Sequence, residues 1–217
     1  MTESAKRPPT TLCNIDLLRG IAALAILFWH YQHFYFPRAG VNGVADSRAE
    51  QPLFDEFAWL YLHGDWAVQF FWILSGFIFF HVYASRRDVG LWEYFSNRFS
   101  RLYPLHFITL FVVAWLQFLS WSWFGHFQIY QLNDVWHFIL NLFMASHWGF
   151  QEGYSFNGPI WSISVEILVY AMFFCFIRAF EIRLVTSALF LVFSLILFSV
   201  SQGPISACAV FFAVGGG

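Results

Sequence analysis

Long apolar stretches dominate this chain and restrict the folds that it can adopt. A helix needs about 20 apolar residues to cross the hydrocarbon core of a bilayer, and several stretches of the sequence reach that length. Charged residues make up only 11% of the chain, against about 25% in soluble domains. The sequence therefore predicts an all-α fold, a polytopic transmembrane helical bundle with about six to seven apolar segments.

The distribution of Lys and Arg predicts the orientation of this bundle. Residues 1–11 form a polar tail with Lys6 and Arg7, and a second basic stretch covers residues 86–101. Lys and Arg gather on the cytoplasmic side of membrane proteins, so both stretches are expected in the cytoplasm, with two crossings between them. The polar residues 38–64 then form an extramembrane loop outside. The predicted spans are residues 12–36, 66–84, 102–123, 159–177 and 184–200, and a further span starts at residue 205.

Residues 135–147 are apolar but short, and several placements fit them. Their length is typical of a short span, a re-entrant segment or an interfacial helix. If Arg178 and Arg183 also lie in the cytoplasm, this segment dips into the membrane and returns. A true crossing would instead place both arginines outside.

The first apolar stretch contains two ionisable side chains, Arg19 and His30. Eleven helical steps separate them and end about 20° past three full turns, so both project from nearly the same face, roughly 16 Å apart along the axis. Ionisable groups within a span are costly and indicate a functional site by default. Taken singly, Arg19 could extend to headgroup phosphates and His30 could hydrogen-bond across helices. As a pair on one face, they favour a catalytic site.

Ser75 and Gly76 form a patch of small residues in the second predicted span. Small residues allow another helix to approach closely within a membrane. The residues alone therefore indicate helix packing at this position.

Arg98 and Arg101 precede a Tyr-Pro pair at the start of the third predicted span. Residues three positions apart are neighbours on a helix, and two guanidiniums at the cytoplasmic mouth suit bidentate phosphate binding. Anchoring against anionic lipid also explains this charge without any ligand.

Glu166 lies inside the predicted span 159–177, shortly after Trp161, and shares a helix face with Ser162. A carboxylate at this depth is expensive unless it is paired or lines a wet cavity. Two roles stay open for Glu166. It could orient His30 by accepting the second ring N–H, or it could pair with Arg19 in the bundle.

Together these motifs resemble acyltransferase family 3, whose members are membrane O-acyltransferases of bacterial surface glycans and other acceptors. The motifs occur in the family's order and cover residues 12 to about 170. The chain departs from the family pattern at Gln69, near which family members usually carry Asp or Glu. The matching motifs are Ile15-Asp-Leu-Leu-Arg19-Gly20 running to His30, Phe70-Phe-Trp-Ile-Leu-Ser-Gly-Phe77, Arg98-Phe-Ser-Arg101-Leu-Tyr-Pro104 and Gly158-Pro-Ile-Trp-Ser-Ile-Ser-Val-Glu166.

The resemblance implies a transmembrane acyltransferase domain over residues 12–217, continuing beyond the C-terminus of this chain. Acyl-CoA, with acetyl-CoA as the family default, would be the donor on the cytoplasmic side. A hydroxyl of a glycan or another acceptor would receive the acyl group outside, and no cofactor would be bound permanently. The implied setting is the lipid bilayer of a bacterial plasma (inner) membrane, with a cytoplasmic N-terminus.

The resemblance also implies roles for individual residues, by motif position. His30, Arg19 and Glu166 would be catalytic, and Arg98 and Arg101 would bind the donor. The remaining motif residues, which would serve the substrate or the structure, are Ser75, Gly76, Trp161 and Ser162.

Two functions from other classes also fit the residues. In a transporter or permease, Arg19, His30 and Glu166 would form a proton or substrate pathway. In a non-catalytic scaffold or lipid-binding bundle, Arg98 and Arg101 would tolerate lysine, because only their charge would matter.

Composition argues against nucleic-acid and metal binding. The formal net charge is −2, and no basic run or patch of the kind that nucleic-acid binding needs is present. No metal site is expected either, because the three cysteines form no CxxC or Cys/His ligand spacing: Cys13, Cys175 and Cys208.

Overall fold

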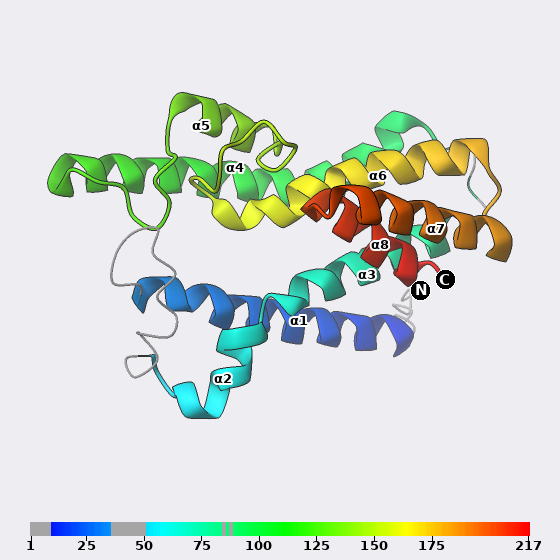
Figure 1. Cartoon of the computed structure of the whole chain (residues 1–217), viewed down its shortest axis with the longest axis horizontal. Helices are drawn as coiled ribbons and strands as arrows, with labels where there is room; N and C mark the ends of the chain where they lie inside the picture. Colours follow the sequence, from blue (N-terminus) through cyan, green and yellow to red (C-terminus); the bar gives the residue numbers. More distant parts are fainter. Residues whose placement is uncertain (1–9, 36–50, 84–85, 87–88) are drawn as a thin grey trace, which may run out of the picture. The chain divides into compact units, whose positions relative to one another are not determined.

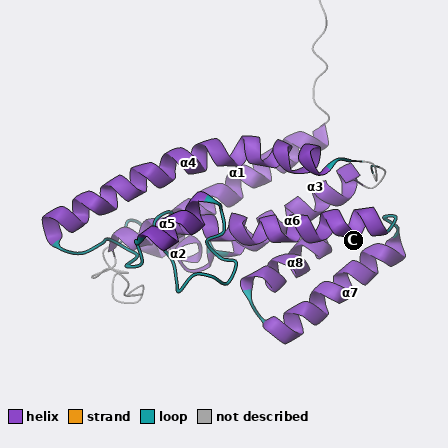
Figure 2. Ribbon diagram, turned by 90° about the horizontal axis from the view of Figure 1, so that it is seen from above, coloured by secondary structure: helices purple, strands orange, loops and turns teal. Residues whose placement is uncertain are grey.

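The computed structural model describes residues 10–35, 51–83, 86 and 89–217, and every regular element within them is a helix (Figures 1 and 2). This confirms the predicted all-α fold. In chain order the elements are α1 (Thr10–Tyr31), the 3-10 turn η1 (Gln32–Tyr35), α2 (Phe54–His63), α3 (Trp66–Tyr83), α4 (Leu91–Phe124), α5 (Val135–Leu142), the 3-10 turn η3 (Gly158–Ile160), α6 (Trp161–Ala179), α7 (Leu184–Ser201) and α8 (Pro204–Gly215).

Four of the described helical segments are long and apolar enough to cross a membrane, and they agree with the predicted spans. Most of the first predicted span is α1, whose 22 residues give a length of about 33 Å. The shorter α8 covers the start of the span that is predicted to begin at residue 205. The four segments are Trp66–Tyr83, Arg98–Phe124, Gly158–Ala179 and Leu184–Ser201.

The chain divides into two compact units. Among the described residues, the first comprises residues 10–35 and 51–71, and the second comprises residues 72–83, 86 and 89–217. Residues 1–9 of the predicted tail and residues 38–50 of the predicted loop 38–64 lie outside the described residues.

In the first unit, α1 packs against α2 through aromatic side chains. The Phe28 ring lies 5.3 Å from the Phe57 ring and 6.0 Å from the Tyr61 ring. A Cβ added to Gly64, at the end of α2, would overlap the carbonyl of Ala25 in α1. The polar residues on either side of α2 led to the prediction of a loop over residues 38–64. The apolar residues of 54–63 nevertheless form a helix, because its aromatic face is covered by α1.

In the second unit, α6 runs antiparallel to the first half of α4. The Tyr94 hydroxyl donates to the carbonyl of Tyr170, 3.0 Å away. At the other end of the contact, Asn157 Nδ2 donates to Thr109 Oγ1 over 3.0 Å. The start of α6 therefore lies beside the middle of α4, about 22 Å from the helix end at Phe124.

Residues 125–157 fold back along the second half of α4 and include α5 (Figure 1). The eight residues of α5 span about 12 Å, far less than the hydrocarbon core of about 30 Å. A helical crossing by residues 135–147 is therefore excluded. The re-entrant and interfacial placements both agree with this geometry.

The small patch in α3 packs against α8. A Cβ added to Gly76 would overlap the carbonyl of Phe212, and one added to Gly215 would overlap the carbonyl of Ile73. The helix backbones therefore touch directly, as the small residues predict.

Replacing Gly76 with leucine should force α3 away from α8. Overpacking of this kind typically costs about 1–3 kcal/mol, so we expect a lower temperature of thermal unfolding in detergent. Gly20→Leu is the matched control, because nothing lies within 4 Å of a Cβ at Gly20. Equal unfolding temperatures for the two variants would contradict the close α3–α8 contact.

Candidate active site

His30 occupies the last turn of α1, where the helix backbone fixes its tautomer. Its Nδ1 lies 3.0 Å from the carbonyl oxygen of Ile26, which can only accept, so Nδ1 carries the proton. The Nε2 lone pair of the neutral ring is then available as an acceptor. The His33 ring stacks on the His30 ring at 5.6 Å, and the Trp29 ring lies 4.8 Å away. These contacts hold a half-buried imidazole in one orientation.

Arg19 lies on the same unbroken helix, near its start. Its side chain is exposed, and its guanidinium lies 3.8 Å from the carboxylate of Asp16. An exposed pair of this kind contributes little to stability, so Arg19 can exchange Asp16 for another anion at low cost. The proposed pairing of Arg19 or His30 with Glu166 stays a prediction, since Glu166 belongs to the other unit.

Glu166 forms a buried polar cluster in the second unit. Its side chain is enclosed by the protein, with Ser75 and Tyr170 in hydrogen-bonding reach of the carboxyl group and Arg98 supplying the nearby positive charge. The Tyr170 hydroxyl also donates to Ser75 Oγ over 3.3 Å. Among the described residues, Glu166 Oε1 has no hydrogen-bond partner. We call Ser75, Arg98, Glu166 and Tyr170 the carboxylate cluster.

Arg98 enters this cluster over two aromatic faces. Its guanidinium carbon lies 4.4 Å from the centre of the Phe79 ring and 5.5 Å from that of Tyr170. Such cation–π contacts stabilise a partly desolvated guanidinium. Arg101, one turn further along α4, is exposed. The two arginines predicted as one phosphate-binding pair thus have different surroundings.

Trp161 and Ser162 begin α6. The Trp161 ring meets the Trp72 ring edge to face at 5.8 Å, and Trp72 Nε1 donates to the carbonyl of Ser162. The Ser162 hydroxyl donates to the carbonyl of Pro159 at 3.3 Å. Both residues therefore join α6 to α3 at the point where α6 starts.

A polar stripe on α4 was missed by the sequence analysis. His106 is buried, and its Nε2 donates to the carbonyl of Asn141 over 2.7 Å, while Nδ1 accepts from Asn157 Nδ2. The spacing of the stripe along one face of an apolar helix was the available signal. Each of its residues has a partner in the segment that folds back over α4. The stripe consists of Tyr103, His106, Thr109, Gln117 and Ser120.

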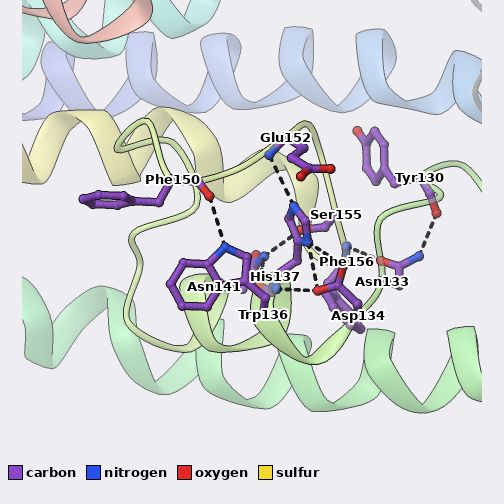
Figure 3. A network of polar contacts seen from close by, with 10 residues as sticks. All are labelled: Tyr130, Asn133, Asp134, Trp136, His137, Asn141, Phe150, Glu152, Ser155 and Phe156. Atoms are coloured by element: carbon purple, nitrogen blue, oxygen red, sulfur yellow. Dashed lines mark hydrogen bonds and ion pairs between the residues drawn. The ribbon is translucent and has the colours of Figure 1, made fainter.

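Asp134 and His137 organise the segment that folds back, as Figure 3 shows. Asp134 caps α5 by accepting the backbone N–H of His137 at 2.9 Å, and it also accepts the ring N–H from Nδ1. The buried ring then accepts the backbone N–H of Glu152 at Nε2. The backbone N–H of His137 is the main reason why the pKa of Asp134 is lowered, with the His137 ring adding to it.

Replacing Asp134 with alanine should loosen α5 without unfolding the bundle. Loss of a helix cap costs about 0.5–2 kcal/mol, so hydrogen exchange of the α5 amides should speed up. Because the pKa of Asp134 is lowered by folding, this stabilisation is complete above the ordinary carboxyl value of 3.8 and is lost as the pH falls through the lower folded value. The Asp134→Asn variant keeps an acceptor and should retain most of the protection. Unchanged exchange in Asp134→Ala would refute the cap.

Comparisons with known proteins agree with the family that the sequence motifs indicate. A family model described as an acyltransferase domain matches residues 14–217. The curated protein named "Protein 2 in picA locus" of Rhizobium radiobacter is 30% identical over 113 residues, which are 51% of this chain and 48% of that protein. The match thus spans about half the length of this relative. No solved structure matches the chain significantly.

Proposed function

Because the chain belongs to the acyltransferase family whose model matches residues 14–217, we propose that it moves an acyl group across the membrane. The donor in this proposal is cytoplasmic acyl-CoA, with acetyl-CoA as the first choice. The acceptor is a hydroxyl of an extracytoplasmic glycan. The protein would lie in a bacterial plasma membrane with its N-terminus in the cytoplasm.

The geometry of His30 supports this proposal most directly. Its Nδ1–H is held by Ile26, so Nε2 can take a proton from the acceptor hydroxyl. The hydroxyl oxygen attacks the thioester carbonyl, the C–S bond breaks, and the released thiolate of coenzyme A takes up a proton. A neutral imidazole suits this general-base role. In a two-step variant, His30 itself first accepts the acyl group.

Arg98 and Arg101 are the proposed donor-binding residues. Guanidiniums bind phosphate oxygens bidentately, and coenzyme A carries several phosphates. Arg101 is exposed and free to reach a ligand, whereas Arg98 is held over Phe79. We therefore assign the first phosphate contact to Arg101, with Arg98 linking the donor to Glu166. Arg101→Lys should weaken donor binding, since lysine cannot form the planar fork.

Mass spectrometry of surface glycans tests the proposed function. Host cells that contain the gene should carry an acyl modification on a surface glycan, and cells from which it is deleted should lack it. Restoring the gene should restore the modification, and restoring it with His30→Ala should not. Identical glycans with and without the gene would reject the proposed acceptor class.

A further inference from the structure

Five rings form a ladder across the start of α6, separate from the carboxylate cluster. Neighbouring ring centres lie 5.0–5.8 Å apart along the ladder. The rings come from α3, from the segment that folds back and from α6. We call this set the aromatic ladder, and in spatial order it consists of Tyr130, Tyr154, His147, Trp161 and Trp72.

The backbone beneath the ladder is fixed by Ser164, a fully buried residue of α6. Its hydroxyl accepts the backbone N–H of His147 at 3.0 Å, and its carbonyl accepts the indole N–H of Trp148 at 2.8 Å. Close packing also fixes the Tyr130 end of the ladder, because a Cβ on Gly158 would overlap the Tyr130 ring. The ladder is therefore held in place at its middle and at its Tyr130 end before any ligand arrives.

The polar edges of the ladder have unused hydrogen-bonding capacity. The Ser146 backbone lies near the His147 ring, and a neutral imidazole keeps one ring nitrogen as an acceptor. Within the part of the chain that the structure describes, no protein partner is recorded for the Tyr154 hydroxyl or the Trp161 indole N–H. The Tyr154 side chain is 45% exposed, and His147 and Trp161 are partly exposed. These groups can thus meet a ligand.

The protonation states decide which groups at the ladder edge donate hydrogen bonds and which accept them. Burial lowers the pKa of His147, so its ring stays neutral near neutral pH and accepts a hydrogen bond. Burial raises the pKa of Tyr154, and it raises the pKa of Tyr130 to about 12, so both phenols keep their protons. The ladder itself contains no Lys or Arg, which makes it a poor site for phosphate or other anions.

We propose that the aromatic ladder binds the sugar ring of the acceptor, which rests on the proposed function and names its acceptor site. A pyranose combines apolar C–H surface with several hydroxyls, and rings with an apolar body and a polar tip match both. His147 would accept a sugar O–H, and Tyr154 and Trp161 would donate to sugar oxygens. Ser164 and Gly158 act as positioning residues in this site.

Saturation-transfer NMR tests this site without requiring catalysis. The full chain in detergent is mixed with the methyl glycosides of glucose, galactose and mannose as probes. We expect saturation of ring C–H protons in at least one glycoside, with loss of the signal in Tyr154→Ala and in His147→Phe. The control Trp115→Ala removes an exposed ring of α4 and should keep the signal.

The outcomes separate this proposal from the proposed function when coenzyme A release is measured in parallel. A wild-type protein that releases coenzyme A but binds none of the glycosides overturns the sugar site and leaves the acyltransferase proposal standing. Glycoside binding without coenzyme A release supports the sugar site and rejects the proposed chemistry. A signal that persists in Tyr154→Ala also overturns the sugar site.

Kinetics add a readout that a purely structural role would not change. His147→Phe keeps a ring in the ladder but removes the acceptor nitrogen. Loss of one hydrogen bond should raise the KM for the glycan acceptor about 3–10-fold, with the KM for acetyl-CoA unchanged. Ser164→Ala should act in the same direction, whereas Ser199→Ala, an exposed serine of α7, should have no effect. Equal changes in both KM values would overturn the proposal.

Discussion

Replacing His30 with alanine should lower the rate of acyl transfer by about 10²–10⁴-fold, the range that general-base catalysis supplies. The reason is local, because Ile26 holds the Nδ1 proton and leaves Nε2 to act on the acceptor hydroxyl. The rate is measured as coenzyme A release from acetyl-CoA in the presence of surface glycan.

His33→Ala is the matched control for this experiment. His33 stacks on His30 and donates its own Nδ1–H to the His30 carbonyl, so its loss perturbs the same turn without removing the proposed base. We expect a decrease of less than tenfold in this variant. Near-normal turnover in His30→Ala would remove His30 from the chemistry.

Replacing Arg98 with alanine should destabilise the fold, because it removes a guanidinium that packs over the Phe79 ring and supplies positive charge near the buried Glu166 side chain. Cation–π contacts of the kind that Arg98 makes with Phe79 and Tyr170 contribute about 0.5–2 kcal/mol. Arg98 is half-buried, so we expect about 2 kcal/mol, or a decrease in Tm of about 4–8 °C for a chain of this size. Thermal unfolding in detergent measures this decrease in Tm.

A double-mutant cycle identifies the cause of that decrease. Glu166→Gln removes the charge that Arg98→Ala leaves unpaired, so the double variant should unfold at a higher temperature than Arg98→Ala alone. If the two decreases simply add, the coupling between Arg98 and Glu166 is absent. Arg98 would then contribute through its contact with Phe79 instead.

The sequence predicted the helical class and four of the spans because apolar length is a property of single segments. It did not predict α2, because the aromatic face of this helix is buried only through its tertiary contact with α1. Gly76 was correctly predicted as a packing position, since the absence of a Cβ has the same consequence in any close helix contact. The partner helix could not be named from spacing.

The sequence was sufficient to predict the surroundings of His30, but not the carboxylate cluster or the aromatic ladder. The His30 tautomer follows from a helical contact four residues away and needs no tertiary structure. The carboxylate cluster and the aromatic ladder combine residues up to about 95 positions apart, as between Ser75 and Tyr170. No periodicity within one helix can bring such residues together, so the position of Arg98 over Phe79 follows only from the tertiary fold.

Transfer across a sealed membrane tests the central claim most directly. Liposomes that contain the protein are loaded with surface glycan, and radiolabelled acetyl-CoA is added outside. The proposed function predicts that label accumulates on the enclosed glycan, with one coenzyme A thiol released outside for each acetyl group transferred. Release of no coenzyme A, together with unlabelled glycan, would contradict it.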